Sequence, residues 1–492
     1  MRKVLAGLHR LKACARAATA RERLHAKFAG ASRVKITLAL AVAVVAVVAA
    51  AQQSDVLIKI TQGERVAIAV PDFRAAGGAQ KFMDAFNQTL FGDLDSSGLF
   101  RMVPKSMYPL ETPQRPQDFR APIISATRPR KGAPPPEPVR QGPWLTDWSQ
   151  PPASATYLAF GYAAEQDGRL VVFGWLYNVT GNDLAGAQAL GKLYFGSLNE
   201  EGARKTAHDF ATDILALFGY KSLVGTKIYF ESNRSGAREI WSMDQDGSNQ
   251  KQLTFYKAIA MRPAVSPDGT MMACTADMKG GWMIRMQSLV TGGRLPFFNP
   301  PSSLNQTPDF TPDGKKIVFS SNVVGSGNQQ LYMANIDGGD LQRLTYSNTI
   351  DVEPRVNPKT GNEIVFVSGR SGLPQIYKMS IDGPDVQRLT DGEGEAVNPA
   401  WDPDGQHIAF AWTRGYAPGH YNIFVMDVAT RQYLQLTHDA GRNENPYWAP
   451  DGRHLAFSSN RDGGTQIWTM LADGTQPQKL TTQGTNMRPV WK

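Results

Sequence analysis

Apolar residues alternate with smaller or polar residues in short runs throughout the second half of the chain. In four of these runs, Ile or Leu precedes Phe by two residues, a spacing that places both side chains on one face of a β-strand. The runs are Ile317/Phe319, Ile364/Phe366, Ile408/Phe410 and Leu455/Phe457. Further runs of the form Ile-aromatic-x-Met occur at residues 240–243, 376–379, 423–426 and 467–470. The pattern predicts many short β-strands.

These strands belong to a sequence repeat. Each period begins with Pro-x-aromatic or Pro-x-Val, and in most periods Pro-Asp-Gly follows, which favours a tight reversal because Pro fixes φ and Gly accepts a positive φ. The first prolines, spaced 45, 46, 45, 47 and 43 residues apart, are Pro263, Pro308, Pro354, Pro399, Pro446 and Pro489. Most periods end in Leu-Thr, although Leu295-Pro296 and Phe297-Phe298 replace it once. Four strands in about 45 residues predict a six-bladed β-propeller over residues 221–492.

The two ends of the repeat region are complementary fragments. Residues 227–230 resemble a second strand without its first strand, and residues 489–491 resemble a first strand without its second. We therefore expect the C-terminal strand to pair beside residues 227–230 and to close the ring, which removes exposed sheet edges.

Residues 52–220 do not repeat and predict a small α/β domain of three or four strands and two helices. The helices are expected at residues 79–95 and 199–218, and two strands of the sheet at residues 157–161 and 170–175. Residues 104–152 hold thirteen of the 32 prolines and predict an extended linker or inserted loop outside the core. The fold class is therefore multidomain, a small N-terminal α/β domain followed by a six-bladed propeller.

The start of the chain has the pattern of an export signal. Residues 1–35 contain ten Lys or Arg and one acidic residue, and an uncharged apolar run at residues 36–51 follows, ending in three alanines. This order predicts a signal peptide at residues 1–51, with an uncleaved membrane anchor as the alternative. The whole chain has a formal net charge of +8, and residues 1–35 alone carry +9. Residues 36–492 therefore have a net charge of −1. Such a balance lacks the basic surface that nucleic-acid binding requires.

Candidate chemistry is sparse. The chain has two cysteines, and Cys14 would leave with the signal peptide, so no disulfide scaffold is expected. Cys274 aligns with Phe319 and predicts a buried thiol, whereas His407 and His454 align with Lys316 on a side expected to lean toward solvent.

Motifs of catalysis and metal binding are also missing from the sequence. A nucleophile elbow, zinc-ligand spacing and a phosphate-binding loop do not occur. Residues 244–249 are interpreted as a turn and not a calcium loop, because a distal Glu is missing. We therefore predict a binding protein and not an enzyme, with no cofactor, catalytic residue or metal ligand.

The propeller mouth is the predicted partner site. The first strand of each blade lines the channel, so the residues just before each proline crowd one rim and offer mixed charge, amides and Met for protein binding. The alternative is that they cap strands and satisfy loop backbone. The pairs are Met261-Arg262, Gln306-Thr307, Val352-Glu353, Val397-Asn398, Glu444-Asn445 and Met487-Arg488. A cluster of carboxylates would indicate the alternative function, an exported hydrolase with its site in the central channel, but Asp351, Glu353 and Glu444 are scattered.

The domain order, the Pro-Asp-Gly repeats and the short C-terminal strand resemble the TolB family of the Tol-Pal envelope system. The resemblance implies a periplasmic scaffold, peripheral to the envelope membranes, that binds the Pal lipoprotein through its propeller and TolA through an N-terminal strand. It also implies a role in outer-membrane integrity and in constriction during cell division. The segment that resembles the TolA-binding box comprises Asp55, Val56, Leu57, Ile58, Lys59 and Ile60. A permanent edge strand is the alternative for this segment, and the proline-rich insertion departs from the family pattern.

Overall fold

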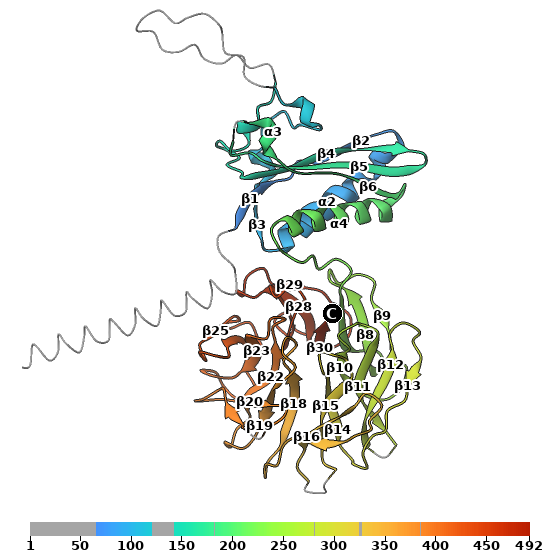
Figure 1. Ribbon diagram of the computed structural model, residues 1–492, viewed down its shortest axis with the longest axis vertical. Coiled ribbons are helices and arrows are strands. Elements are labelled where there is room, and N and C mark those ends of the chain that lie inside the picture. The colour runs from blue at the N-terminus through green and yellow to red at the C-terminus, as the bar shows by residue number, and fades with distance from the viewer. Residues whose placement is uncertain (1–64, 121–141, 182, 280, 324–326, 384) are drawn as a thin grey trace, which may run out of the picture. The chain divides into compact units, whose positions relative to one another are not determined.

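The computed structural model describes residues 65–120, 142–181, 183–279, 281–323, 327–383 and 385–492 (Figure 1). Residues 60–492 belong to one compact unit. The predicted signal peptide and the segment Asp55–Ile60 lie outside the described residues. Within the described ranges, no helix is both long enough and apolar enough to cross a membrane.

The N-terminal domain is built on a six-stranded sheet in the order β3-β1-β4-β5-β6, with β2 paired to β4. β1 runs parallel to β3 and β4, whereas β4, β5 and β6 are antiparallel. The turn between β4 and β5 has positive φ at both Asp167 and Gly168, as a two-residue hairpin requires. The strands are β1 (Val66–Ala69), β2 (Arg74–Ala76), β3 (Phe100–Met102), β4 (Tyr157–Gln166), β5 (Arg169–Asn178) and β6 (Gln188–Ser197).

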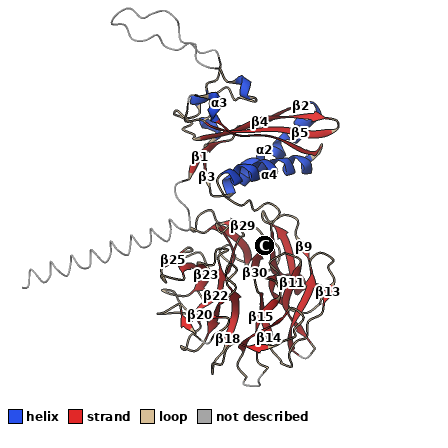
Figure 2. Ribbon diagram, viewed as in Figure 1, coloured by secondary structure: helices blue, strands red, loops and turns tan. Residues whose placement is uncertain are grey.

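Two long helices pack side by side along one face of this sheet (Figure 2). They are α2 (Met83–Ser96) and α4 (Glu200–Leu217), close to the predicted bounds. Both bury an apolar stripe in one core, and the Asn199 side chain begins α4 by accepting the Gly202 N–H at 2.7 Å. The short helices are η1 (Gly77–Phe82), η2 (Lys105–Met107), η3 (Pro116–Asp118), η4 (Leu145–Asp147) and α3 (Leu184–Ala187).

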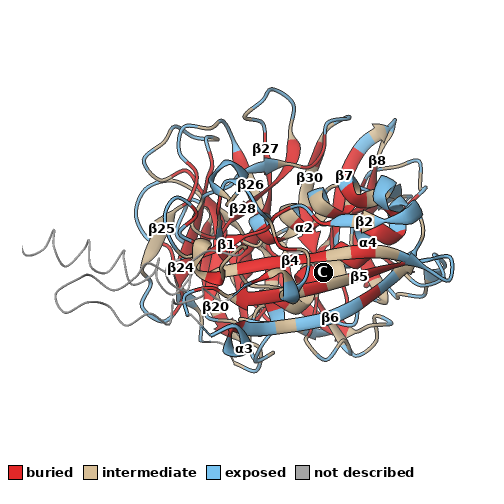
Figure 3. Ribbon diagram, turned by 90° about the horizontal axis from the view of Figure 1, so that it is seen from above, coloured by how far each residue is buried: buried red, intermediate tan, exposed pale blue. Residues whose placement is uncertain are grey.

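The opposite face of the sheet carries a second core that the sequence did not predict. Phe119, Leu145 and Trp148 are buried there, and the Phe119 and Phe160 ring centroids are 5.6 Å apart. The prediction that residues 104–152 lie outside the core is therefore wrong for the described ends of that region. Proline removes backbone hydrogen bonds, but it does not prevent neighbouring aromatic side chains from packing. The sheet also has more strands than predicted, because β2 and β6 were missed; Figure 3 shows that β6 is exposed along most of its length.

Residues 227–491 form six four-stranded sheets, the blades of a propeller (Figure 1), and confirm the predicted fold class. In order, the blades are β10 (Ala260–Val265), β11 (Met271–Met278), β12 (Gly281–Ser288) and β13 (Arg294–Leu295); β14 (Asn305–Phe310), β15 (Lys316–Ser321), β16 (Gln330–Asn335) and β17 (Gln342–Arg343); β18 (Asp351–Val356), β19 (Glu363–Ser368), β20 (Gln375–Ser380) and β21 (Gln387–Arg388); β22 (Ala396–Trp401), β23 (His407–Trp412), β24 (Asn422–Asp427) and β25 (Tyr433–Gln435); β26 (Asn443–Trp448), β27 (His454–Ser459), β28 (Gln466–Leu471) and β29 (Gln478–Lys479); and β30 (Asn486–Trp491), β7 (Lys227–Ser235), β8 (Ala237–Asp244) and β9 (Lys251–Gln252).

The last of these blades closes the ring as predicted. β30 pairs antiparallel with β7, and Lys227 and Lys492 exchange backbone hydrogen bonds of 2.6 and 2.9 Å. The Trp491 side chain is buried, and its indole N–H donates to the Thr226 hydroxyl at 2.8 Å. Burial of this aromatic residue holds the C-terminal strand in the ring.

The recurring Leu-Thr has a structural cause. In five blades the buried Thr hydroxyl accepts a backbone N–H of the third strand and donates to the side chain of the residue before that N–H. In the blade of β28, for example, Thr481 accepts from the Ile467 N–H at 2.9 Å and donates to Gln466 Oε1 at 2.7 Å. The five threonines are Thr254, Thr345, Thr390, Thr437 and Thr481. Each joins the third strand to the segment that leads to the next blade.

Candidate functional site

The first strand of every blade contains a bulge just before its proline, where the register with the second strand shifts. The residue before each proline has a positive φ, between 52° and 56°, although none of the six is glycine. These residues are Arg262, Thr307, Glu353, Asn398, Asn445 and Arg488. All six line a narrow cavity of about 30 Å³ inside the ring, and a wider cavity of about 500 Å³ is lined by later residues of the same first strands. The repeated bulge therefore brings one polar residue per blade into the channel.

Three ion pairs hold the charges of this cavity, and in one of them Arg355 Nη1 donates to Asp309 Oδ1 at 3.3 Å. Arg262 Nη1 donates to Glu353 Oε1 at 2.6 Å, and Arg488 Nη1 donates to Glu231 Oε2 at 3.0 Å. Glu231 is completely buried on β7 and also accepts the Arg262 backbone N–H at 2.7 Å. The charged side chains inside the ring are therefore paired with one another.

Glu353 is held as a carboxylate. Burial alone would raise its pKa, but the Arg262 guanidinium and the Asn398 backbone N–H outweigh burial and hold the pKa of Glu353 below its ordinary value. The Asn398 N–H lies 2.8 Å from Oε2, and the Asn398 amide donates to the same oxygen at 3.0 Å. Glu353 thus performs the strand-capping role that the sequence left open.

The other predicted partner-binding residues of the propeller point elsewhere. Asp351 is buried and pairs with Arg370 at 2.9 Å, and Glu444 pairs with Arg442 at 2.6 Å. Gln306 Oε1 accepts from the Gln329 amide, while Val352 packs against the core of the neighbouring blade. The structure therefore brings together six predicted residues in the channel and leaves Gln306, Asp351, Val352 and Glu444 outside that cavity.

Exposed apolar side chains lie on the same edge of the propeller, in loops that the sequence analysis did not single out. Phe255 is 69% exposed, Tyr346 73% and Leu373 52%. Phe255 and Tyr346 lie between the fourth strand of one blade and the first strand of the next, and Leu373 lies between β19 and β20. Ile259 and Ile350, also exposed, directly precede first strands. We call Phe255, Ile259, Tyr346, Ile350 and Leu373 the apolar rim. Phe255 and Tyr346 could have been noticed in the sequence, because each is an aromatic residue directly after Leu-Thr, a position at which the repeat does not require one.

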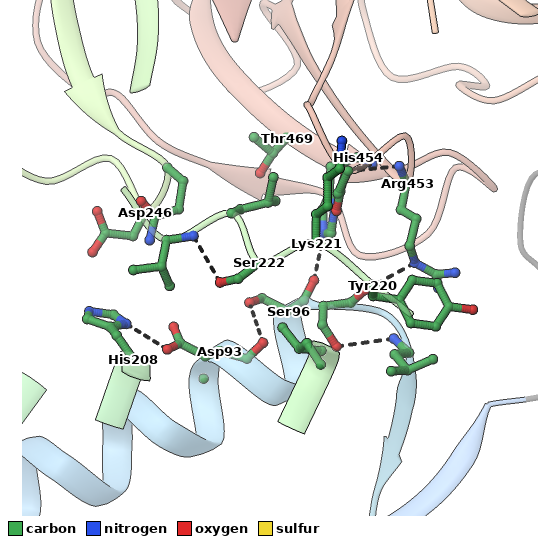
Figure 4. Close-up of a pocket in the computed structure, with 18 of the residues that line it drawn as sticks. Asp93, Ser96, His208, Tyr220, Lys221, Ser222, Asp246, Arg453, His454 and Thr469 are labelled. Carbon is green, nitrogen blue, oxygen red and sulfur yellow. Dashed lines mark hydrogen bonds and ion pairs between the residues drawn. The ribbon is translucent and has the colours of Figure 1, made fainter. Parts of the chain in front are cut away.

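Near the other edge of the propeller, a cavity of about 330 Å³ is lined by residues of α2, α4, the segment 220–224 and the turn before β27 (Figure 4). His454 Nδ1 lies 2.6 Å from Asp451 Oδ2, and His454 Nε2 lies 2.6 Å from the Ser96 carbonyl oxygen. Arg453 donates to the Gly98 carbonyl at 2.9 Å, and its guanidinium lies 4.8 Å from the centre of the Tyr220 ring. This turn joins the propeller to the end of α2.

The expected orientation of the two strand-start histidines is wrong. His407 and His454 are both 7% exposed, because an aspartate of the preceding turn accepts from each ring and compensates its polarity. Cys274 is buried as predicted. In the part of the chain that the structure describes, no group of three or more His, Cys, Asp or Glu side chains is placed to hold a metal ion.

The departure of the second repeat from Leu-Thr is explained in part by packing. Phe297 packs into the core between two blades, with its ring centroid 6.1 Å from that of Phe319. Phe298 is 71% exposed. Packing therefore accounts for Phe297, while a partner contact stays open for Phe298.

A ring of six four-stranded blades, closed by the C-terminal strand and preceded by an α/β domain, defines a propeller protein. Residues 214–397 and 389–492 match the family model of the TolB beta propeller domain, and residues 55–123 match that of the TolB amino-terminal domain. Because the propeller match spans more than half of the chain, the chain belongs to the TolB family.

Individual relatives agree with this assignment. A TolB homologue of Chlorobium chlorochromatii (strain CaD3) is 36% identical over 215 residues, 44% of this chain and 46% of the relative. A TolB homologue of Chlorobaculum tepidum is 31% identical over 297 residues, 59% of this chain and 58% of the relative. The chain thus spans about half the length of the curated relatives it matches. The crystal structure of TolB from Acinetobacter baumannii shares the fold with a TM-score of 0.69 at 22% identity, covering 87% of this chain and 97% of that one.

Proposed function

We propose that this protein is a periplasmic scaffold of the Tol-Pal envelope system that binds Pal through its propeller and TolA through residues 55–60. In this role it supports outer-membrane integrity and constriction during cell division, and it is peripheral to the envelope membranes. The observation that carries the proposal is the apolar rim on the edge of the propeller.

The rim supports protein binding for a physical reason. Aromatic and aliphatic side chains exposed on a surface gain free energy when a partner removes them from water, and such residues are enriched at the centres of protein interfaces. The polar residues of the channel are already paired with one another, so they offer few unsatisfied groups to a small molecule. We therefore place the Pal contact on the rim loops, with the predicted residues Arg262, Thr307, Glu353, Asn398, Asn445 and Arg488 supporting those loops from inside.

The TolA contact rests on the sequence, because residues 55–60 lie outside the described ranges. Val56, Ile58 and Ile60 alternate with Leu57 and Lys59, a pattern that suits pairing as a β-strand. A partner that adds this segment to a sheet would gain main-chain hydrogen bonds along it and side-chain pockets on both faces.

The Pal contact is tested by removing apolar surface from the rim. We expect the double variant F255S/L373S to bind Pal at least about tenfold more weakly, since interface anchors typically contribute more than about 1 kcal/mol each. The matched control is L193S/F195S, which removes two similarly exposed apolar side chains from β6 of the α/β domain. Equal affinity of the rim variant and the wild type, measured by calorimetric titration, would contradict the proposed site.

The TolA contact is tested separately. Deletion of residues 55–60 should abolish capture by immobilised TolA while leaving Pal binding unchanged. If the deletion leaves TolA capture intact, the N-terminal strand is not the contact, whatever the result for the propeller.

A further inference from the structure

Two histidines contact the last turns of α2 from opposite sides of the cavity in Figure 4. His208, on α4, has Nδ1 2.6 Å from Asp93 Oδ2 on α2. His454, at the start of β27 in the propeller, has Nε2 2.6 Å from the carbonyl oxygen of Ser96, the last residue of α2. The C-terminal turn of this helix is therefore the point at which the propeller meets the helical layer of the α/β domain.

Both ring nitrogens of His454 face acceptors. Nδ1 faces the Asp451 carboxylate and Nε2 faces a peptide carbonyl, and neither of these groups can donate a hydrogen bond. A neutral imidazole carries one N–H, so either tautomer would direct a lone pair at an oxygen 2.6 Å away. Only the imidazolium form satisfies both contacts.

The surroundings of His454 also favour the cation. The negative end of the α2 dipole lies at Ser96, and the Asp451 carboxylate comes from the turn that precedes β27. Arg453 of the same turn opposes the charge, and Lys221 lines the same cavity from the linker. Asp93 of α2 is engaged by His208, while β28 and β30 contribute the uncharged Thr469 and Trp491 to the cavity wall.

We propose that His454 is a pH-responsive clamp, which holds the end of α2 on the propeller when its ring is protonated and releases it when the ring is neutral. The neighbouring Arg453 and Gly98 contact remains in both states, so the clamp changes the strength of the attachment. The neutral ring loses at least one of two hydrogen bonds and the ion pair with Asp451.

The direction of the pH response follows from the pKa. Burial lowers the pKa of His454, but Asp451 and the Ser96 carbonyl outweigh burial and raise it above the ordinary 6.5. A histidine whose pKa is raised on folding contributes its full stabilisation below the unfolded value and loses it as the pH rises through the folded value. The clamp is therefore closed in acid and opens as the pH rises above 6.5.

The preceding blade supplies a matched control. His407 also begins a second strand and bonds an aspartate, Asp402, at 3.1 Å. Its Nε2 lies 3.8 Å from Asp427 and has no hydrogen-bond partner among the described residues. His407 thus shares the local environment of His454 but lacks the contact with α2.

The decisive experiment follows the ring nitrogens of the seven histidines by ¹⁵N NMR in the intact protein between pH 5.5 and 9. We expect His454, assigned by its loss in H454Q, to carry protons on both nitrogens at pH 5.5 and to titrate above 6.5. Titration of His454 at or below 6.5 would overturn the proposal, and this measurement on the wild type does not depend on the folding of a variant.

Hydrogen exchange measures the clamp itself. After correction for the intrinsic exchange rate, amides at the end of α2 should exchange more slowly at pH 6 than at pH 9, because the protonated ring stabilises the attachment. In H454Q this pH response should be lost, and in H407Q it should remain. D451N serves as the second variant and should also lose the response. A response that persists in both H454Q and D451N would overturn the proposal.

Discussion

Arg262 Nη1 and Glu353 Oε1 lie 2.6 Å apart although the two residues are separated by 91 positions in the chain. Arg262 comes from β10 and Glu353 from β18, so their ion pair crosses the channel between two blades that are not neighbours. Glu353 also accepts from Asn398 of β22. One carboxylate therefore joins the inner strands of three blades.

The variant E353Q tests this junction. The neutral amide cannot compensate the positive charge of Arg262, which stays largely buried. We therefore expect a loss of about 1–3 kcal/mol in the free energy of unfolding at pH 7. Urea denaturation followed by circular dichroism measures it. The control is E444Q, whose carboxylate pairs with the exposed Arg442 and should matter by less than about 1 kcal/mol. Equal effects of the two substitutions would argue against a structural role for the channel pair.

The effect of E353Q should depend on pH. Because the folded pKa of Glu353 is depressed, its contribution is fully present above the ordinary value of 4.5 and is lost as the pH falls through the lower folded value. The difference in stability between wild type and E353Q should therefore shrink as the pH falls from 4.5 toward 3. A difference that stayed constant over this range would show that Glu353 is not ionised in the folded protein.

Truncation of the C-terminal strand tests ring closure. Removal of residues 489–492 deletes the buried Trp491 and its strand pairing with β7, and loss of a large buried aromatic alone typically costs about 3–5 kcal/mol. We expect a marked drop in melting temperature by calorimetry. The substitution W491F, which keeps most of the packing and loses the bond to Thr226, should lower it by less. An unchanged melting temperature after truncation would refute the closure.

Cys274 should be chemically inert in the folded protein. Burial raises the pKa of its thiol to about 12, so almost none of the reactive thiolate is present at pH 8. Alkylation with iodoacetamide is measured by mass spectrometry of the peptide that contains Cys274. It should be negligible under native conditions and complete in urea at about 8 M, which unfolds the protein. Rapid native labelling would show that this strand opens.

Gly98 tests the contact between the end of α2 and the propeller. Its φ is +64°, and a Cβ there would lie 2.6 Å from Leu471 Cδ1. We expect G98A to destabilise the protein by about 1–2 kcal/mol from backbone strain alone, with a further loss from the clash. Adding L471A should relieve the clash and not the strain, so a double-mutant cycle with a non-zero coupling energy is the expected result.

The number of blades could be predicted because the same residue types recur once per blade, at a spacing of about 45 residues. Pro-Asp-Gly makes the reversal after the first strand in four blades, and the buried Leu-Thr holds the third strand in five blades by the same hydrogen bonds. Such residues recur because the same backbone geometry recurs. The two long helices were equally visible, because their apolar residues follow one face.

The site was harder to predict, because its contacts are not repeated. His407 and His454 occupy equivalent positions in adjacent blades, yet only His454 meets α2, and the repeat cannot distinguish them. The positive φ of Glu353 and its equivalents turns side chains into the channel that an ordinary strand would have directed differently. Trp148 lies in a proline-rich stretch of sequence and is nevertheless buried, and β6 is a strand although it is largely exposed. Both depend on tertiary packing that the local sequence pattern does not contain.

Closure of the ring by β30 also determines where mechanical load enters the propeller. The other five blades are each made from a continuous stretch of chain, whereas the blade of β30 and β7 is held together at Lys227 and Lys492 by hydrogen bonds between the two ends of the propeller segment. The segment that leads from α4 arrives at this same blade, directly before β7. A pulling force on the N-terminal domain would therefore reach the ring first at the blade of β30 and β7. In this blade β30 is joined to β7 by hydrogen bonds and not by a connecting loop.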